Sequence, residues 1–134
     1  MGSTNVQLAR DAIAAWNRRE PDIWTQFAAP DFEWLPAGPA AVDRVAYHGH
    51  AEAAEGVTTA FETFELFEFD GDDVRDLGRG ALWLGRLRTR GGASGVEFER
   101  EFALEFTVAD DRFTRVRGYA SWADALQATG LAEQ

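Results

Sequence analysis

Alternation of apolar and charged side chains in the second half of the chain is the feature that most constrains its fold. Within residues 97–106, the four large apolar side chains Phe98, Phe102, Leu104 and Phe106 occupy even positions and the glutamates occupy odd positions, with Arg100 the one exception on the even side. Successive side chains of a β-strand point to opposite faces, so this pattern predicts a strand with one apolar and one charged face. Residues 81–90 follow the same period, with tryptophan and leucine on one face and arginines on the other.

The alternating segments predict an antiparallel meander of strands separated by glycine-containing or polar turns. Its strands are expected at residues 65–77, 81–90, 96–108 and 113–120. Facing strands then bring a row of arginines beside a row of glutamates and a second row of arginines. Opposite charges on facing strands stabilise a sheet by about 0.2–1 kcal/mol per pair, which favours this register.

The charged face of this meander has two interpretations that the residues leave open. It is formed by Arg86, Arg88, Glu99, Glu101, Arg115 and Arg117. One interpretation is a solvated sheet surface, and the other is a polar interface between the two chains of a homodimer.

The first half of the chain reads mainly as helix. Helices are expected over residues 3–17, 21–29 and 50–64, short strands over 32–35 and 45–47, and a loop over 37–44. Ser3 or Thr4 is suited to cap the first helix, and Pro21 to the first turn of the second. A short closing helix is expected over residues 122–128, ended by Gly130. Helices followed by a meander indicate the α+β class, as one domain over residues 1–134, with helices on one face of a curved sheet.

Composition limits the partners and the chemistry. The chain has 134 residues, 46% of them hydrophobic, and a net charge of −10. Such an acidic domain is repelled by phosphate backbones and anionic lipids, which argues against nucleic-acid and membrane partners. The absence of cysteine excludes disulfides and thiol catalysis. With neither a long apolar stretch nor a signal-peptide pattern, we expect a cytoplasmic protein, and no residue pattern calls for a cofactor.

The apolar face combines large rings with very small residues. Gly85, Gly118 and Ala120 lie near large aromatic side chains on this face. Such neighbours leave a cavity if nothing fills the space above the small residues; the alternative is that Trp16 and the phenylalanines fill it. The expected pocket wall consists of Trp16, Trp34, Tyr47, Phe61, Trp83, Phe102, Leu104, Phe106 and Val116.

Several short segments, in this order, resemble a known family. They are residues 12–18 (AIAAWNR), 27–34 (FAAPDFEW), 47–50 (YHGH), 94–97 (SGVE), 113–119 (FTRVRGY) and 123–126 (ADAL). Together they are similar to the SnoaL-like branch of the nuclear transport factor 2-like superfamily, which includes ketosteroid isomerases and polyketide cyclases. The resemblance implies a cone-shaped antiparallel sheet, a cystatin-like roll, with three covering helices and a short C-terminal helix. It also implies a pocket for small apolar molecules and frequent dimers through the sheet.

The resemblance does not carry one activity, because this fold hosts isomerases, cyclases, hydrolases and binding proteins. The catalytic base of ketosteroid isomerases falls at Pro36 in this chain. Their oxyanion-hole residues fall near Ala12 and Leu104, and Ser121 stands where the family often has aspartate. None of these side chains supports the isomerase chemistry.

Four polar residues are the weak candidates for catalysis: Tyr47, His48, His50 and Glu33. The hydroxyl of Tyr47 is suited to donate to a ligand carbonyl, and a histidine or Glu33 to act as a base. The alternatives are a core tyrosine, a helix-capping His50 and an outward-facing Glu33. The two histidines lack a third ligand at suitable spacing, so no metal site is expected. Aspartates around Gly71 lack calcium-loop spacing and are read as a solvated turn.

Three functions fit the sequence. The first is binding of a small hydrophobic molecule in an aromatic pocket. The second is a cofactor-independent isomerase, cyclase or hydrolase working by general acid/base catalysis, which needs a polar pair in the pocket. The third is a structural dimerisation domain with a closed core.

Overall fold

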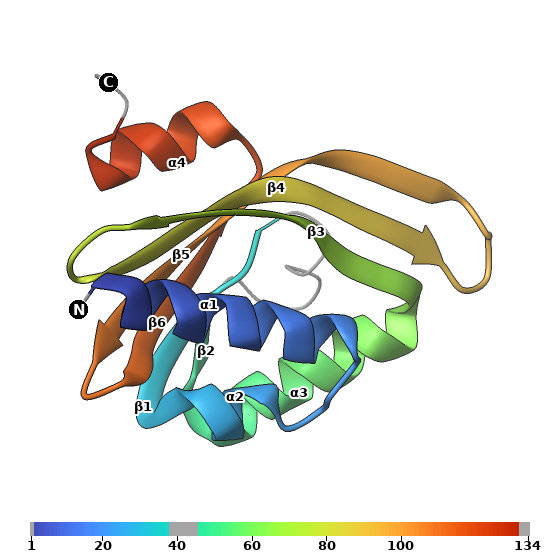
Figure 1. Ribbon diagram of the computed structural model, residues 1–134. Helices are drawn as coiled ribbons and strands as arrows, with labels where there is room; N and C mark the ends of the chain where they lie inside the picture. The colour runs from blue at the N-terminus through green and yellow to red at the C-terminus, as the bar shows by residue number, and fades with distance from the viewer. Residues whose placement is uncertain (1, 38–45, 132–134) are drawn as a thin grey trace.

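The computed structural model describes residues 2–37 and 46–131 and shows a curved sheet of six strands in the order β2-β1-β6-β5-β4-β3 (Figure 1). Its elements are α1 (Gly2–Asn17), α2 (Ile23–Phe27), β1 (Ala28–Leu35), β2 (Tyr47–His48), α3 (Gly49–Thr63), β3 (Phe64–Asp76), β4 (Gly80–Gly91), β5 (Glu97–Ala109), β6 (Arg112–Tyr119) and α4 (Trp122–Thr129). Helices α1, α2 and α3 lie on the concave side, and α4 lies on the opposite side. The predicted α+β architecture is confirmed.

The start of the chain departs from the prediction at three places. Helix α1 begins at Gly2, so Ser3 and Thr4 lie inside the helix rather than capping it. Helix α2 begins at Ile23, so Pro21 precedes it. Residues 28–31 belong to strand β1 rather than to a helix end. Here Ala28 pairs with Phe113 in a parallel β1–β6 ladder, and this pairing overrides the local helical pattern. The predicted loop at 37–44 and the first residue of the predicted strand at 45–47 lie largely outside the described residues.

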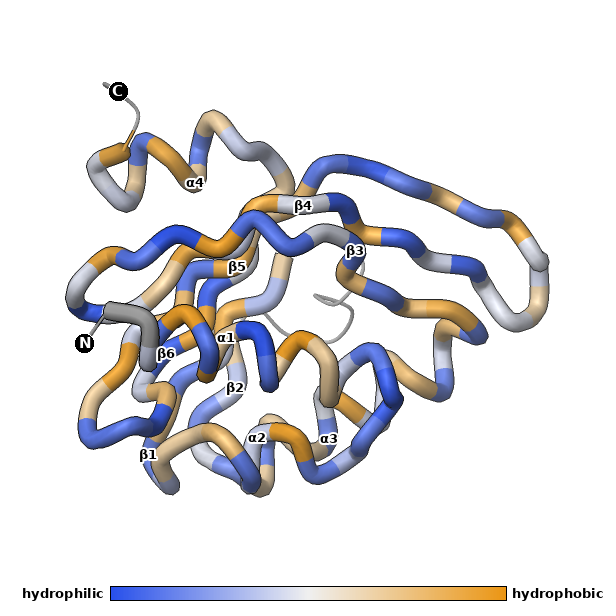
Figure 2. The backbone as a smooth tube through the Cα atoms, viewed as in Figure 1, coloured by the Kyte–Doolittle hydropathy of each residue, from blue (hydrophilic) through white to orange (hydrophobic). Residues whose placement is uncertain are grey.

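The charged rows pair as the alternation predicts. In the β4–β5 register, Arg86 faces Glu101, Arg88 faces Glu99 and Arg90 faces Glu97. Figure 2 shows hydrophilic and hydrophobic residues alternating along both strands. The outer face is not uniformly charged, however. A small apolar cluster under α4 consists of Leu82, Leu84, Ala103, Tyr119 and Ala125.

Helix α1 seals the free edge of β3, which is an edge strand of the sheet. The Asn17 side chain donates to the carbonyl of Phe69 and accepts from its N–H, both at 2.9 Å. The Trp16 indole N–H donates to Phe67 O at 3.0 Å, and the Arg10 guanidinium donates to Asp72 O at 3.0 Å. Covering an edge in this way satisfies its exposed backbone groups. It also holds Trp16 over the inner face of the sheet.

The inner face and its helices form the main core, which is dominated by aromatic rings. The buried rings include Trp16, Trp24, Phe32, Trp34, Tyr47, Phe67, Phe69, Trp83, Phe102, Phe106 and Phe113. Most neighbouring rings meet at tilted or edge-on angles, as for Trp16 and Phe67, whose centroids lie 5.1 Å apart at 68°, and Phe69 stacks on Phe102. Such geometry is favourable for aromatic pairs. No helix in the described part of the chain is long and apolar enough to cross a membrane.

Candidate functional site

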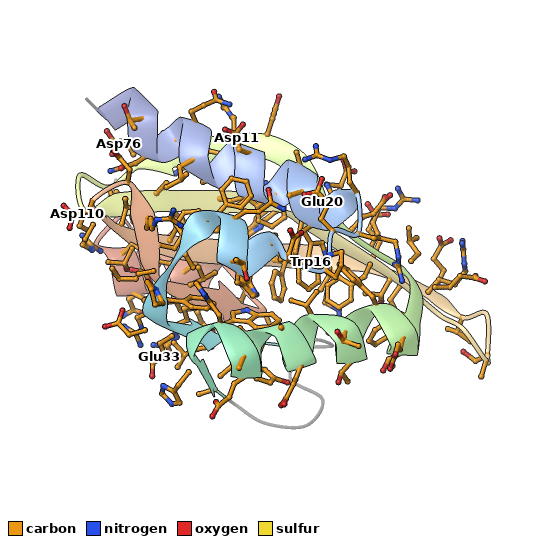
Figure 3. All side chains as sticks on the ribbon, turned by 90° about the horizontal axis from the view of Figure 1, so that it is seen from below. Asp11, Trp16, Glu20, Glu33, Asp76 and Asp110 are labelled. Carbon is orange, nitrogen blue, oxygen red and sulfur yellow. The ribbon has the colours of Figure 1, made fainter. Side chains whose placement is uncertain are left out.

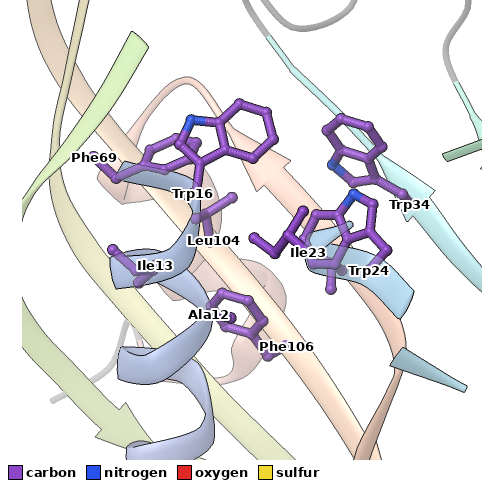
Figure 4. Close-up of a pocket in the computed structure, with 10 residues that line it drawn as sticks. Ala12, Ile13, Trp16, Ile23, Trp24, Trp34, Phe69, Leu104 and Phe106 are labelled. Carbon is purple, nitrogen blue, oxygen red and sulfur yellow. The ribbon is translucent and has the colours of Figure 1, made fainter. Parts of the chain in front are cut away.

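A small apolar cavity lies between helices α1 and α2 and the inner face of the sheet (Figure 4). Its volume is about 20 Å³, measured as the space open to the centre of a water molecule. The lining residues are Ala12, Ile13, Trp16, Ile23, Trp24, Trp34, Phe69, Leu104, Phe106 and Val116. About one water-sized group fits in such a space. The cavity is therefore narrow, and its described walls carry only hydrocarbon and indole groups.

Each wall of the cavity is positioned by a different element. Helix α1 contributes Trp16, whose ring is fixed by its hydrogen bond to β3 and by Phe61, 4.8 Å away between centroids. Strand β1 contributes Trp34, which stacks on Tyr47 at 5.1 Å. Helix α2 contributes Ile23 and Trp24, both buried. The alternation of β5 and β6 aims the remaining apolar side chains inward.

Trp24 carries the polar group that stands out in this apolar wall. The residue is 6% exposed, and its ring lies 5.4 Å from those of Phe32 and Trp34. Among the residues that the structure describes, its indole Nε1 is the buried side-chain polar atom without a hydrogen-bond partner. Figure 4 shows this nitrogen on the edge of the ring nearest Trp34. A buried N–H left unpaired costs about 1–3 kcal/mol.

The indoles of Trp16, Trp83 and Trp122 are each hydrogen-bonded to a backbone carbonyl. The Trp83 indole donates to Gly71 O at 2.9 Å. The Trp122 indole, on the outer face, is shared between Gly85 O at 3.0 Å and Phe102 O at 3.1 Å. The unpaired state of Trp24 is thus a local property of the α2 corner.

The residues predicted to form the pocket divide into two groups. Those that line the cavity are Trp16, Trp34, Leu104, Phe106 and Val116. Tyr47, Phe61, Trp83 and Phe102 do not line it and instead pack behind it. Sequence reasoning missed five lining residues: Ala12 and Ile13 on α1, Ile23 and Trp24 on α2, and Phe69 on β3. The apolar spacing of α2 was visible, but its orientation depends on packing against β1.

The space expected above small residues is filled. A Cβ atom added to Gly85 would lie 2.3 Å from the Trp83 ring, and one on Gly118 would lie 3.1 Å from the Phe102 ring. Ala120 is exposed. The expectation that these small residues leave a cavity was wrong, because the glycines accommodate neighbouring rings. Gly56 on α3 does the same for Tyr47 and Trp34, whose ring atoms would lie 2.7 and 2.8 Å from an added Cβ.

The catalytic candidates lie away from the cavity. Glu33 projects outward (Figure 3), with its carboxylate 3.8 Å from His48 Nδ1 and 3.5 Å from Arg115 Nε. His48 ends β2, whereas His50 lies in the first turn of α3, so the two histidines do not share a strand. The His50 Nε2 atom is 2.9 Å from Ala28 O. His50 does not cap α3, since His48 holds that position without a side-chain cap.

Tyr47, the remaining candidate, is buried and stacked behind Trp34. Within residues 2–37 and 46–131, no group of three or more histidine, aspartate or glutamate side chains is arranged to hold a metal ion.

Side chains of the charged face are engaged within one chain. Arg86 pairs with Glu99 at 3.1 Å, and Arg88 pairs with Glu68 at 3.4 Å. The carboxylate of Glu101 accepts the Trp122 backbone N–H at 2.8 Å. The homodimer through this face stays a prediction.

Tyr119 lies beneath α4 on the outer face. Its hydroxyl donates to Glu105 at 2.7 Å. Burial, together with this carboxylate, raises the pKa of Tyr119 to about 12. The guanidinium of Arg117 lies over its ring, 5.1 Å from the centroid.

Solved structures resemble this chain over almost its whole length. An NTF2-like protein of unknown function from Burkholderia pseudomallei has a TM-score of 0.78 at 18% identity, covering 92% of this chain and 95% of that one. A protein from Jannaschia named as a SnoaL-like polyketide cyclase has a TM-score of 0.75 at 18% identity, covering 98% and 94%. A Catenulispora acidiphila protein with a ketosteroid isomerase-like fold, solved in complex with trimethylamine, has a TM-score of 0.74 at 14% identity, covering 95% of each chain. These likenesses show the fold.

The sequence itself carries the family assignment. No curated protein matches the chain. The family model of the SnoaL-like domain matches residues 9–116, which include the second half of α1, all of the elements from α2 to β5 and the first part of β6. The chain therefore belongs to the SnoaL-like domain family, with an NTF2-like fold.

Proposed function

We propose that this protein binds a small hydrophobic molecule in the cavity between α1, α2 and the sheet. The observation that carries the proposal is the chemistry of the lining, whose described residues offer hydrocarbon, aromatic and indole groups. Ligand pockets combine an apolar wall with few polar groups that orient the ligand. The cavity has this composition on a small scale.

The narrowness of the cavity limits how a ligand enters. With about 20 Å³ of space, a whole ring system does not fit unless lining side chains shift. A small molecule, or the end of a larger one, is therefore the expected occupant. One protein of this fold has been solved in complex with trimethylamine, a very small ligand, which supports a small occupant.

The acid/base alternative needs a titratable group at the cavity. The candidates His48 and Glu33 lie together on the outer side, where they contact each other. Binding is therefore the function that this geometry supports best, and an isomerase, cyclase or hydrolase activity is the alternative. A closed structural core is the third possibility, and the following experiment separates it from the other two.

The test is thermal melting of the protein with a panel of neutral apolar molecules graded in size. A ligand present at about 100 times its dissociation constant adds roughly 2.7 kcal/mol of stability, which raises the melting temperature. Mass spectrometry of each stabilising compound after incubation tests for turnover and hence for the enzymatic alternative. If no compound of any size raises the melting temperature, the closed-core interpretation replaces the proposal.

A matched pair of variants locates the binding site. Ala12 lines the cavity at 1% exposure, while Ala14 is exposed on the same helix. Ala12→Leu fills the cavity and is expected to abolish the ligand-induced shift, whereas Ala14→Leu is expected to leave it unchanged. Equal shifts in both variants would place the ligand elsewhere.

A further inference from the structure

The Trp24 indole N–H is a donor that the fold leaves without an acceptor. It is buried, it belongs to a residue lining the cavity, and it has no hydrogen-bond partner among the described residues. Buried polar groups in folded proteins are nearly always paired, so each exception calls for an explanation. A bound ligand that carries an acceptor supplies one.

The surroundings of Trp24 restrict the charge of that acceptor. The neighbouring rings of Phe32 and Trp34 give the N–H an apolar environment in which an ion is poorly solvated. The protein carries a net charge of −10, which repels anions. A cation is disfavoured next to the positive end of an N–H group. An uncharged oxygen or nitrogen acceptor meets all of these conditions.

The rest of the ligand is restricted by the other walls. Ile23, Leu104 and Val116 present only hydrocarbon to the cavity. The other indole on the helical side, that of Trp16, already donates to Phe67 O. Indole N–H groups are the polar side-chain groups among the described lining residues, so a donor or a charged group on the ligand would be left unpaired here, whereas one acceptor on an apolar body is satisfied.

We propose that the Trp24 indole N–H is the polar anchor of the cavity and donates to the single uncharged acceptor of an otherwise apolar ligand, such as a ketone or an ether. This inference rests on the proposed function, because it names the class of molecule that the same cavity binds. In this proposal, the end of the ligand that carries the acceptor occupies the narrow cavity beside Trp24.

The experiment compares two small acyclic probes of nearly the same shape, butan-2-one and 2-methylbut-1-ene, of which only the ketone carries an acceptor. Both are titrated into ¹⁵N-labelled protein while the indole N–H signals of its five tryptophans are followed by NMR. Trp24→Phe assigns the Trp24 signal by its disappearance. We expect the ketone to move this signal downfield and the alkene not to do so.

Affinities measured in the variants provide a second readout. We expect Trp24→Phe to lower the ketone affinity relative to that of the alkene by about 5-fold, since it removes one neutral hydrogen bond. Any change in cavity shape affects both probes and cancels in the ratio. Trp122→Phe, on the outer face, is the control and should leave the ratio unchanged.

The possible failures are distinguishable. If both probes bind, but the Trp24 signal and the affinity ratio do not respond to the acceptor, this inference is overturned and the proposed function stands. If neither probe binds at any accessible concentration, the proposed function fails for molecules of this size, and the inference fails with it. The NMR titration of the native protein decides even if Trp24→Phe does not fold.

Discussion

Two regions of the helical layer hold a tryptophan against the same sheet in opposite ways. At the α1–β3 seam, the Trp16 indole N–H and the Asn17 amide are hydrogen-bonded to the backbone of β3. At the α2–β1 corner, Trp24 packs against the rings of Phe32 and Trp34, and its N–H has no hydrogen-bond partner among the described residues. The side chains of Trp16 and Asn17 are hydrogen-bonded to β3, whereas the indole of Trp24, which lines the cavity, has no partner among the described residues. Both helices line the cavity, but α1 is fixed to the edge strand by hydrogen bonds, whereas α2 is held by apolar packing.

The lengths of the two helices fit this division. Helix α1 spans 16 residues and is anchored along the edge strand by side chains several turns apart. Helix α2 has 5 residues, too few to be stable by itself, so its place depends on packing. A short element held by apolar contacts shifts more easily than one that is hydrogen-bonded along its length.

The largest expected effect comes from removing the indole N–H in each region. Trp16→Phe deletes a buried hydrogen bond and leaves Phe67 O unpaired, so we expect a loss of about 2–3 kcal/mol in the free energy of unfolding. Trp24→Phe removes an N–H that is already unpaired, and this offsets part of the lost packing. We expect it to cost about 1–2 kcal/mol less than Trp16→Phe. Urea unfolding of both variants measures the difference, and equal losses would contradict the comparison.

A second test uses Tyr119, a paired group on the outer face whose proton can be removed. Its pKa of about 12 lies above its ordinary value of 10.0, so folding favours the protonated hydroxyl. The stability from this group is therefore complete below about pH 10 and is lost as the pH rises toward 12. We expect Tyr119→Phe to reduce the loss of stability between pH 10 and 12 by about 1–2 kcal/mol.

Chemical unfolding of both proteins at several pH values checks this expectation. If the free energy of unfolding falls equally with pH in the native protein and in Tyr119→Phe, deprotonation of Tyr119 does not cause the loss of stability.

Much of the sheet was predictable because a period of two fixes the face of each side chain. The alternation correctly separated Trp83 and Leu87 from the arginines of β4, and it predicted that these arginines face the glutamates of β5, as Arg88 faces Glu99. The alternation along a strand gives the face on which a side chain lies, but not whether another part of the molecule covers that face. Phe98 is on the apolar side by parity but is 55% exposed, because the β4–β5 hairpin extends past the helices (Figure 1).

The cavity was harder to predict because it depends on contacts between distant segments. Residues 28 and 29 read locally as a helix end but lie in β1, where Ala28 pairs with Phe113 of β6, and this pairing sets the position of α2. The role of Trp24 follows from that position and has no local sequence signal. Glycines next to rings are equally ambiguous, since a ring either leaves the space open or occupies it, as Trp83 does at Gly85.

The smallest expected effect is the contribution of a solvent-exposed ion pair to the stability of the sheet. Arg86 and Glu99 lie 3.1 Å apart with about half of each side chain exposed, so solvent screens their attraction. A double-mutant cycle with Arg86→Ala and Glu99→Ala should give a coupling of about 0.2–1 kcal/mol, decreasing with added salt. A coupling as large as the loss in Trp16→Phe would mean that surface pairs hold this sheet as firmly as the buried seam does. A small, salt-sensitive coupling would place the stabilising contacts on the inner face, where Trp16 is paired and Trp24 is not.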